Sequence, residues 1–282
     1  PREMLSKRNN EPTAAHHGFR NLGLRLRSVA IFAPPVFAAV YFGTPWFDFM
    51  IAATAMVMVW EWARMCSDGA FSLVGWAMEA GIAVCLLALY LSDPLVSLVA
   101  AAIAAVLVGM FAALRRHESP ARMALGAALV GFFCLAFLWL RALPGSGLDM
   151  VIWVVLAVWF TDAGGYFFGR TIGGPKLAPR ISPNKTWAGL GGGILLAAIW
   201  SGIWLSWRGG HDVVPVIAAA VCIAVLAQLG DLSVSSVKRR FGVKDTSGLI
   251  PGHGGVLDRL DGMLLTGPAV AFVLVLSGKG WI

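Results

Sequence analysis

The sequence predicts an all-α, polytopic membrane protein. Of its 282 residues, 58% are hydrophobic and only 13% are charged, whereas a soluble domain carries about 25% charged residues. The mean hydropathy is +0.76. The apolar runs are about 20 residues long and continuous rather than alternating, which favours membrane-spanning helices over a β-barrel.

We expect about nine spans, the first of them kinked or tilted by Pro34 and Pro35. They cover residues 28–44, 46–63, 71–91, 95–114, 122–141, 150–169, 187–207, 213–233 and 260–279. This layout divides the chain into an interfacial segment (1–27), a first group of helices (28–145) and a C-terminal catalytic region (146–282).

The basic residues predict the orientation of these spans. If the N-terminus is cytoplasmic, 19 of the 22 Lys and Arg residues lie on the cytoplasmic side, as the positive-inside rule requires. The loops 170–187 and 234–259 then share that face. The same rule explains the net charge of +7, so we expect no nucleic-acid partner. Residues 18–28 suit either a short interfacial helix or a basic flank of the first span.

The polar stretch 229–262 holds three acidic residues that predict a metal site. Asp258 and Asp261 are three residues apart, so they share a face of a helix, and Asp231 ends the preceding span. Three converging carboxylates repel one another unless a cation lies between them. Oxygen ligands favour Mg²⁺, alone or with a second cation. The alternative is that Asp258 and Asp261 only cap the last helix.

The same stretch also predicts an anion site. Basic residues, glycines and further polar groups surround the carboxylates, namely Lys238, Arg239, Lys244, Asp245, His253, Gly254, Gly255 and Arg259. Glycine-rich backbone can present N–H groups to phosphate oxygens. Together with a metal, these groups are typical of phosphoryl or nucleotidyl transfer. The alternative is a solvated positive patch.

Other polar residues add to this prediction. In loop 170–187, Lys176, Ser182 and Lys185 could hold a second anionic group, although Ser182 could also only shape the turn. Asp162 is an acid within a span and precedes two glycines that permit close helix approach, so it is a functional candidate. For Glu61, an i,i+3 pair with Arg64 is as good an explanation as a functional role.

The C-terminal half resembles the signature of the phosphatidate cytidylyltransferases, the CDP-diacylglycerol synthases. The matching positions are Ser235-x-Val237-Lys238-Arg239, Lys244-Asp245 and Ile250-Pro251-x-His253-Gly254-Gly255-Val256-x-Asp258-Arg259-Leu260-Asp261, with Gly230-Asp231-Leu232 and Ile181-Ser182-Pro183-x-Lys185-Thr186 beside them. Two positions depart from the family's pattern. Gly262 stands where Ser is usual, and Ala188 stands where an acid is common.

This resemblance implies a nucleotidyltransferase that makes CDP-diacylglycerol and diphosphate from CTP and phosphatidate. It implies that Asp231, Asp258 and Asp261 hold Mg²⁺ and that Ser182 and Lys185 contact a phosphate. It also implies a homodimer. From the count of basic residues we expect the active site on the cytoplasmic face of the inner membrane, and we expect Ser235 and Asp162 beside the substrates. Two alternatives remain open: a cytidylyltransferase for another lipid phosphate, and a membrane transporter.

Overall fold

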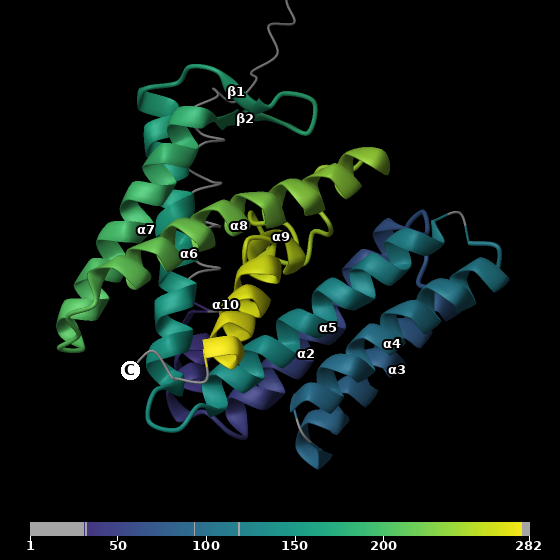
Figure 1. The fold of residues 1–282 in the computed structure, drawn as a ribbon. Coiled ribbons are helices and arrows are strands. Elements are labelled where there is room, and N and C mark those ends of the chain that lie inside the picture. The colour runs from purple at the N-terminus through teal and green to yellow at the C-terminus, as the bar shows by residue number, and fades with distance from the viewer. Residues whose placement is uncertain (1–30, 32, 93, 118, 278–282) are drawn as a thin grey trace, which may run out of the picture.

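The computed structural model describes residues 31, 33–92, 94–117 and 119–277. Nearly all of the elements are helices, as predicted (Figure 1). They are α2 (Trp46–Met65), α3 (Leu73–Leu91), α4 (Pro94–Leu114), α5 (Pro120–Ala142), α6 (Gly147–Thr171), α7 (Trp187–Trp207), α8 (Val213–Arg240), α9 (Leu257–Leu260) and α10 (Met263–Ser277). A shorter apolar helix covers Ala33–Phe42. The segment 18–28, for which a short helix was one expectation, lies outside the described residues.

Six helices, α3 to α8, are long and apolar enough to cross a membrane, so the protein is a multi-pass membrane protein. The other predicted spans coincide with shorter or more polar helices. α10 has 15 residues, and α2 holds Asp48, Glu61 and Arg64 within its 20 residues. The count of nine spans therefore stays a prediction.

Two boundaries differ from the prediction and move site residues. α8 continues to Arg240 instead of ending near residue 233, so Ser235, Lys238 and Arg239 lie on a helix rather than in a loop. Basic side chains at its last turn favour this extension because they complement the helix dipole. Loop 170–187 contains a small antiparallel hairpin of β1 (Lys176–Ala178) and β2 (Ser182–Thr186). The all-α prediction missed it because Ser-Pro-Asn is a poor strand sequence.

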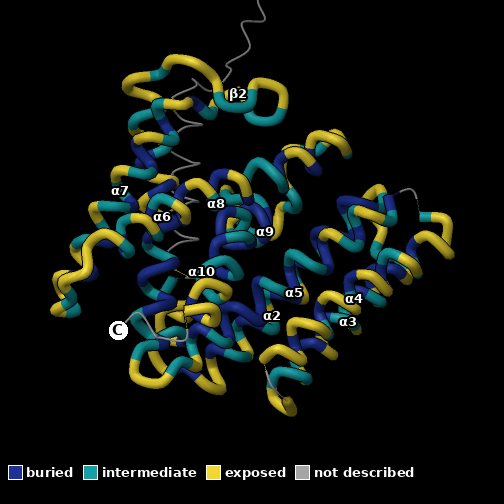
Figure 2. The backbone as a smooth tube through the Cα atoms, in the orientation of Figure 1, coloured by how far each residue is buried: buried dark blue, intermediate teal, exposed yellow. Residues whose placement is uncertain are grey.

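The helices form two groups that meet at the centre of the molecule. α3 and α4 pack together at one edge and against α5, while α6, α7 and the start of α8 form the other edge (Figure 1). α10 joins the groups because it contacts α5, α6 and α8. The most deeply buried backbone follows α2 and α5 in this centre (Figure 2). There the Trp62 indole donates to the Arg122 carbonyl oxygen at 2.9 Å.

Glycines allow α6 and α7 to pack with their backbones in contact. Gly164 of α6 lies against the backbone of Gly192 and Gly193, and Gly165 lies against Gly189. Such small residues are the usual means of close helix packing in membranes. The glycines after Asp162 thus permit the close helix approach that the sequence predicted. The Thr186 hydroxyl accepts the Gly189 N–H and caps α7, which fixes the hairpin at this end of the pair.

Candidate active site

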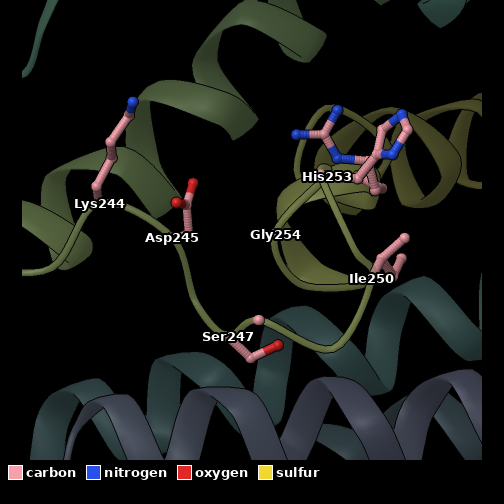
Figure 3. Close-up of a pocket in the computed structure, with 9 residues that line it drawn as sticks. Lys244, Asp245, Ser247, Ile250, His253 and Gly254 are labelled. Carbon is pink, nitrogen blue, oxygen red and sulfur yellow. The ribbon is translucent and has the colours of Figure 1, made fainter. Parts of the chain in front are cut away.

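A polar cavity of about 690 Å³ lies where the connection between α8 and α9 folds back on itself (Figure 3). Lys244 and Asp245 lie on one side of it, and His253 lies on the other (Figure 3). Its lining residues are Lys244, Asp245, Ser247, Gly248, Ile250, Gly252, His253, Gly254 and Arg259. The structure therefore brings together four of the predicted charged or titratable residues, Lys244, Asp245, His253 and Arg259, with Gly254.

Glycines shape the wall of this cavity. Gly252 and Gly254 have φ angles of +77° and +83°, a region that other residues rarely adopt. They form a tight turn in which the Ile250 N–H donates to the Gly254 carbonyl at 2.9 Å. Gly255 has no room for a side chain, because a Cβ atom there would collide with Thr246 and Glu61.

Asp258 stabilises this loop by accepting hydrogen bonds from several of its groups. Its Oδ1 accepts from the Lys238 ammonium at 2.7 Å. Its Oδ2 accepts from the Thr246 N–H, the Gly255 N–H and the Thr246 hydroxyl at 2.8, 3.0 and 3.0 Å. Burial acts to raise the pKa of Asp258, but Lys238 and the two N–H groups outweigh it and hold that pKa below its ordinary value.

Two residues that were expected at the anion site have partners within the protein, and their roles toward a substrate stay predictions. Lys238 was expected to face a bound anion, but it is buried and neutralises Asp258 instead. Gly255 was expected to offer its N–H group to a phosphate, but Asp258 already accepts that group. Gly254 does line the cavity. The loop is thus stabilised internally, and Lys244, His253 and Arg259 are the cavity's basic or titratable nitrogen groups.

A second acidic group gathers where α6, α8 and the α9–α10 connection meet. Gly230 lies directly against the Asp261 carbonyl, and this contact brings the neighbouring Asp231 close to Asp261. Asp261 interacts electrostatically with Asp231 and with Asp162. Burial, followed by the charge of Asp231, raises the pKa of Asp261, which lies outside α9 and α10, above its ordinary value.

Cations partly balance these acids. Lys185 from the hairpin forms an ion pair with Asp231 at 2.6 Å, and the Ser235 hydroxyl donates to the same carboxylate at 3.0 Å. Arg259, which lines the cavity, interacts electrostatically with Asp162. Arg259 therefore links the cavity with the acidic group.

The carboxylates of Asp231 and Asp261 have the chemistry that Mg²⁺ prefers. Both oxygens of Asp258 already accept hydrogen bonds from Lys238 and the loop, and both oxygens of Asp231 contact Lys185 and Ser235. Within the described part of the chain, no three His, Cys, Asp or Glu side chains are close enough to enclose a metal ion. The magnesium site thus stays a prediction. Asp162, like Asp231, interacts electrostatically with Asp261.

The remaining predicted residues lie around the hairpin. Arg239 donates from Nε to the Ile181 carbonyl at 3.3 Å and from a terminal nitrogen to the Val243 carbonyl at 3.2 Å, so it ties the hairpin to α8. Lys176 is exposed on β1, and Ser182 is half-buried at the start of β2. Neither one lines the cavity. A role of these two residues in phosphate binding stays a prediction.

Glu61 has a different partner from the one the sequence suggested. Arg64, the expected i,i+3 partner, donates instead to the Gly69 carbonyl at 2.7 Å and lies over the Trp60 ring. Glu61 accepts hydrogen bonds from the connection between α8 and α9, including one from the Ser247 hydroxyl at 2.6 Å. The signal available in the sequence was a carboxylate in an apolar helix, which identifies a candidate without showing its partner.

The helical membrane fold, the cavity with its basic lining and the neighbouring carboxylates are consistent with a membrane enzyme that acts on phosphate-containing substrates. A family model described as the cytidylyltransferase family matches residues 23–277. The chain belongs to this cytidylyltransferase family.

Curated relatives carry a more particular name. A protein of Brucella suis biovar 1 (strain 1330) named phosphatidate cytidylyltransferase is 35% identical over 269 residues, which cover 92% of this chain and 93% of the relative. Proteins with the same name from Bacillus subtilis (strain 168) and Haemophilus influenzae are 38% identical over 153 residues and 40% identical over 134 residues. These two matches cover 54% and 46% of this chain, and 57% and 46% of the relatives.

Proposed function

We propose that this protein is a nucleotidyltransferase that makes CDP-diacylglycerol and diphosphate from CTP and phosphatidate. The observation that carries the proposal is the cavity lined by Lys244, His253 and Arg259 beside the carboxylates of Asp231 and Asp261, in a protein built of membrane-spanning helices. Its volume of about 690 Å³ lies within the range of small-molecule sites. The names and extent of the relatives support the same reaction.

In this mechanism, a phosphate oxygen of phosphatidate attacks the α-phosphorus of CTP. The bond from that phosphorus to the oxygen bridging to the β-phosphate breaks, and diphosphate leaves with the bond's electron pair. Lys244 and Arg259 offset the charge of the triphosphate and of the leaving diphosphate. The lipid phosphate is already ionised at neutral pH, so the reaction requires no strong general base.

The metal requirement is a separate part of the proposal. Asp231 and Asp261, with Asp162 beside them, are the carboxylates that would hold Mg²⁺. When bound, the ion would supply positive charge next to the reacting phosphates. Lys185 would hold the Asp231 carboxylate toward the hairpin. The role of Asp258 is then to shape the loop, through Lys238, Thr246 and Gly255.

Turnover by the purified protein tests the reaction. The full chain in detergent is given CTP, phosphatidate and Mg²⁺, and the lipid extract is analysed for CDP-diacylglycerol. Parallel reactions with an isoprenoid phosphate distinguish an enzyme for another lipid phosphate. Product from phosphatidate is the expected result. Absence of turnover with any lipid phosphate, from protein that is folded and binds CTP, would contradict the proposal.

We propose that the protein lies in the inner membrane with the cavity on the cytoplasmic face, and the distribution of basic residues supports this orientation. Cysteine labelling tests it in a Cys222→Ser background, because Cys222 is the exposed cysteine among the four. We expect His211→Cys, between α7 and α8, to react with a membrane-impermeant maleimide on intact cells. Leu249→Cys should react only after permeabilisation. The reverse pattern would invert the topology. The homodimer stays a prediction from the resemblance.

A further inference from the structure

Glu61 lies in the middle of the protein, far in sequence from the residues it contacts. It belongs to α2 and is completely buried. Its carboxylate accepts hydrogen bonds from the connection between α8 and α9, which carries the wall of the cavity. A buried carboxylate is costly unless its oxygens are satisfied by hydrogen bonds, so the partners of Glu61 identify what it does.

Glu61 contacts four donors, three in this connection and one, Leu257, at the start of α9. Oε1 accepts from the Ser247 hydroxyl at 2.6 Å and from the Val256 N–H at 2.9 Å. Oε2 accepts from the Leu257 N–H at 2.7 Å and lies 3.2 Å from the Thr246 hydroxyl, whose one hydrogen it shares with Oδ2 of Asp258. All four donors are neutral. The carboxylate therefore joins the beginning of the loop, residues 246–247, to its end, residues 256–257.

Asp258 also accepts hydrogen bonds from both ends of the loop. It accepts the N–H groups of Thr246 and Gly255 and the Thr246 hydroxyl. Thr246 thus lies between the two carboxylates, and the absence of a side chain at Gly255 leaves the space in which they approach. Between the two ends that Glu61 and Asp258 hold together lies the segment from Gly248 to Gly254, which lines the cavity.

We infer that Glu61 is a positioning residue of the active site, which holds loop 246–257 in the form that receives the triphosphate of CTP. It acts through the loop and touches no substrate. The inference rests on the proposed function for its kinetic consequence, although the clasp itself does not depend on the reaction. It also assigns the first half of the chain a part in the site, beyond the catalytic region 146–282 that the sequence predicted.

Glu61→Gln is the decisive change because it keeps the size of the side chain. The amide nitrogen replaces only one of the two oxygens and is a donor, so it cannot accept from the N–H group that it faces, whether that of Val256 or that of Leu257. Glu79→Gln is the matched control. It makes the same chemical change in the neighbouring helix α3, at a side chain that does not face the loop.

Hydrogen exchange and steady-state kinetics are measured on the full chain in detergent. We expect Glu61→Gln to speed amide exchange in peptides covering 246–257 by about tenfold, with α5 unchanged, because one backbone N–H group loses its acceptor and the remaining hydrogen bonds lose the negative charge. We also expect KM for CTP to rise by about tenfold while KM for phosphatidate stays within about twofold. A merely structural role would reduce the amount of active protein without changing KM for CTP. Glu79→Gln should resemble the wild type in all of these measurements.

Unchanged exchange in 246–257, or an unchanged KM for CTP in folded Glu61→Gln protein, would overturn the inference. If this variant does not fold, Ser247→Ala replaces it, since that change removes one donor to Glu61 and leaves the buried carboxylate in place. It should raise exchange of the same peptides by about threefold, and no rise would overturn the inference. If the wild type lacks turnover, the proposed function fails, and the exchange comparison still decides whether Glu61 clasps the loop.

Discussion

Gly230 of α8 lies directly against the carbonyl group of Asp261, with no space for a side chain between them. This contact places Asp231, the next residue of α8, beside Asp261. The proposed magnesium ligands are therefore positioned by backbone packing between a long helix and the connection from α9 to α10.

Gly230→Ala should lower activity by about tenfold or more, because the added methyl group must push α8 away from Asp261. Gly202→Ala in α7 is the control, since a Cβ atom there meets open space. Alanine is otherwise the better helix former. Thermal unfolding and turnover are measured for both variants. Similar behaviour of the two would show that the contact between Gly230 and Asp261 does not position the site.

Lys238→Met should destabilise the protein by about 3 kcal/mol or more, because it leaves the buried Asp258 carboxylate without its cation. The double variant Lys238→Met with Asp258→Asn should recover part of that loss, since no unpaired charge remains. Unfolding in denaturant is followed for both single variants and the pair. If the two losses simply add, the ion pair seen between Lys238 and Asp258 contributes nothing to stability.

Lys244→Ala should raise KM for CTP by about tenfold, because the ammonium group lies at the cavity wall. Arg240→Ala removes an equal charge four residues earlier, at an exposed position that does not line the cavity. The measurement is steady-state kinetics with varied CTP. An equal rise in KM for CTP in both variants would show that Lys244 does not bind CTP and only contributes to the basic patch that sets the membrane orientation.

Asp261→Asn should slow turnover by about a hundredfold, on the order of 2.7 kcal/mol of transition-state stabilisation. It should also raise the Mg²⁺ concentration needed for half of the remaining activity, if Asp261 is a ligand. Asp258→Asn should instead lower thermal stability, because Lys238 and the loop amides lose their acceptor. Activity of the wild type should disappear with EDTA. Full activity in chelator, or unchanged turnover in folded Asp261→Asn protein, would refute the metal role.

Gly262→Ser introduces the residue that the resemblance described above leads us to expect at this position. A Cβ atom at this position would lie 3.2 Å from Cγ1 of Val158 and 3.6 Å from Cβ of Ala227, so Val158 must move by a few tenths of an ångström. We expect a loss of stability of about 1 kcal/mol and activity within about threefold of the wild type. A large rise in activity would instead show that Gly262 impairs this protein.

The helical fold could be predicted from the sequence because long apolar runs leave the backbone few alternatives in lipid. The grouping of Lys244, Asp245, His253, Gly254 and Arg259 could also be predicted, since these residues are close in sequence, and they line one cavity. Pairings across the fold could not. Whether Lys238 faces an anion or Asp258, and whether Glu61 meets Arg64 or a loop far along the chain, depends on helix packing that periodicity does not encode.

The most direct test of the central claim follows the α- and γ-phosphates of CTP separately. Purified protein is incubated with phosphatidate and CTP labelled at either position, and the lipid and aqueous phases are counted. Label from the α-phosphate should enter the lipid phase, and label from the γ-phosphate should appear only in diphosphate. Lipid-bound γ-label, or release of inorganic phosphate in place of diphosphate, would contradict nucleotidyl transfer by this protein.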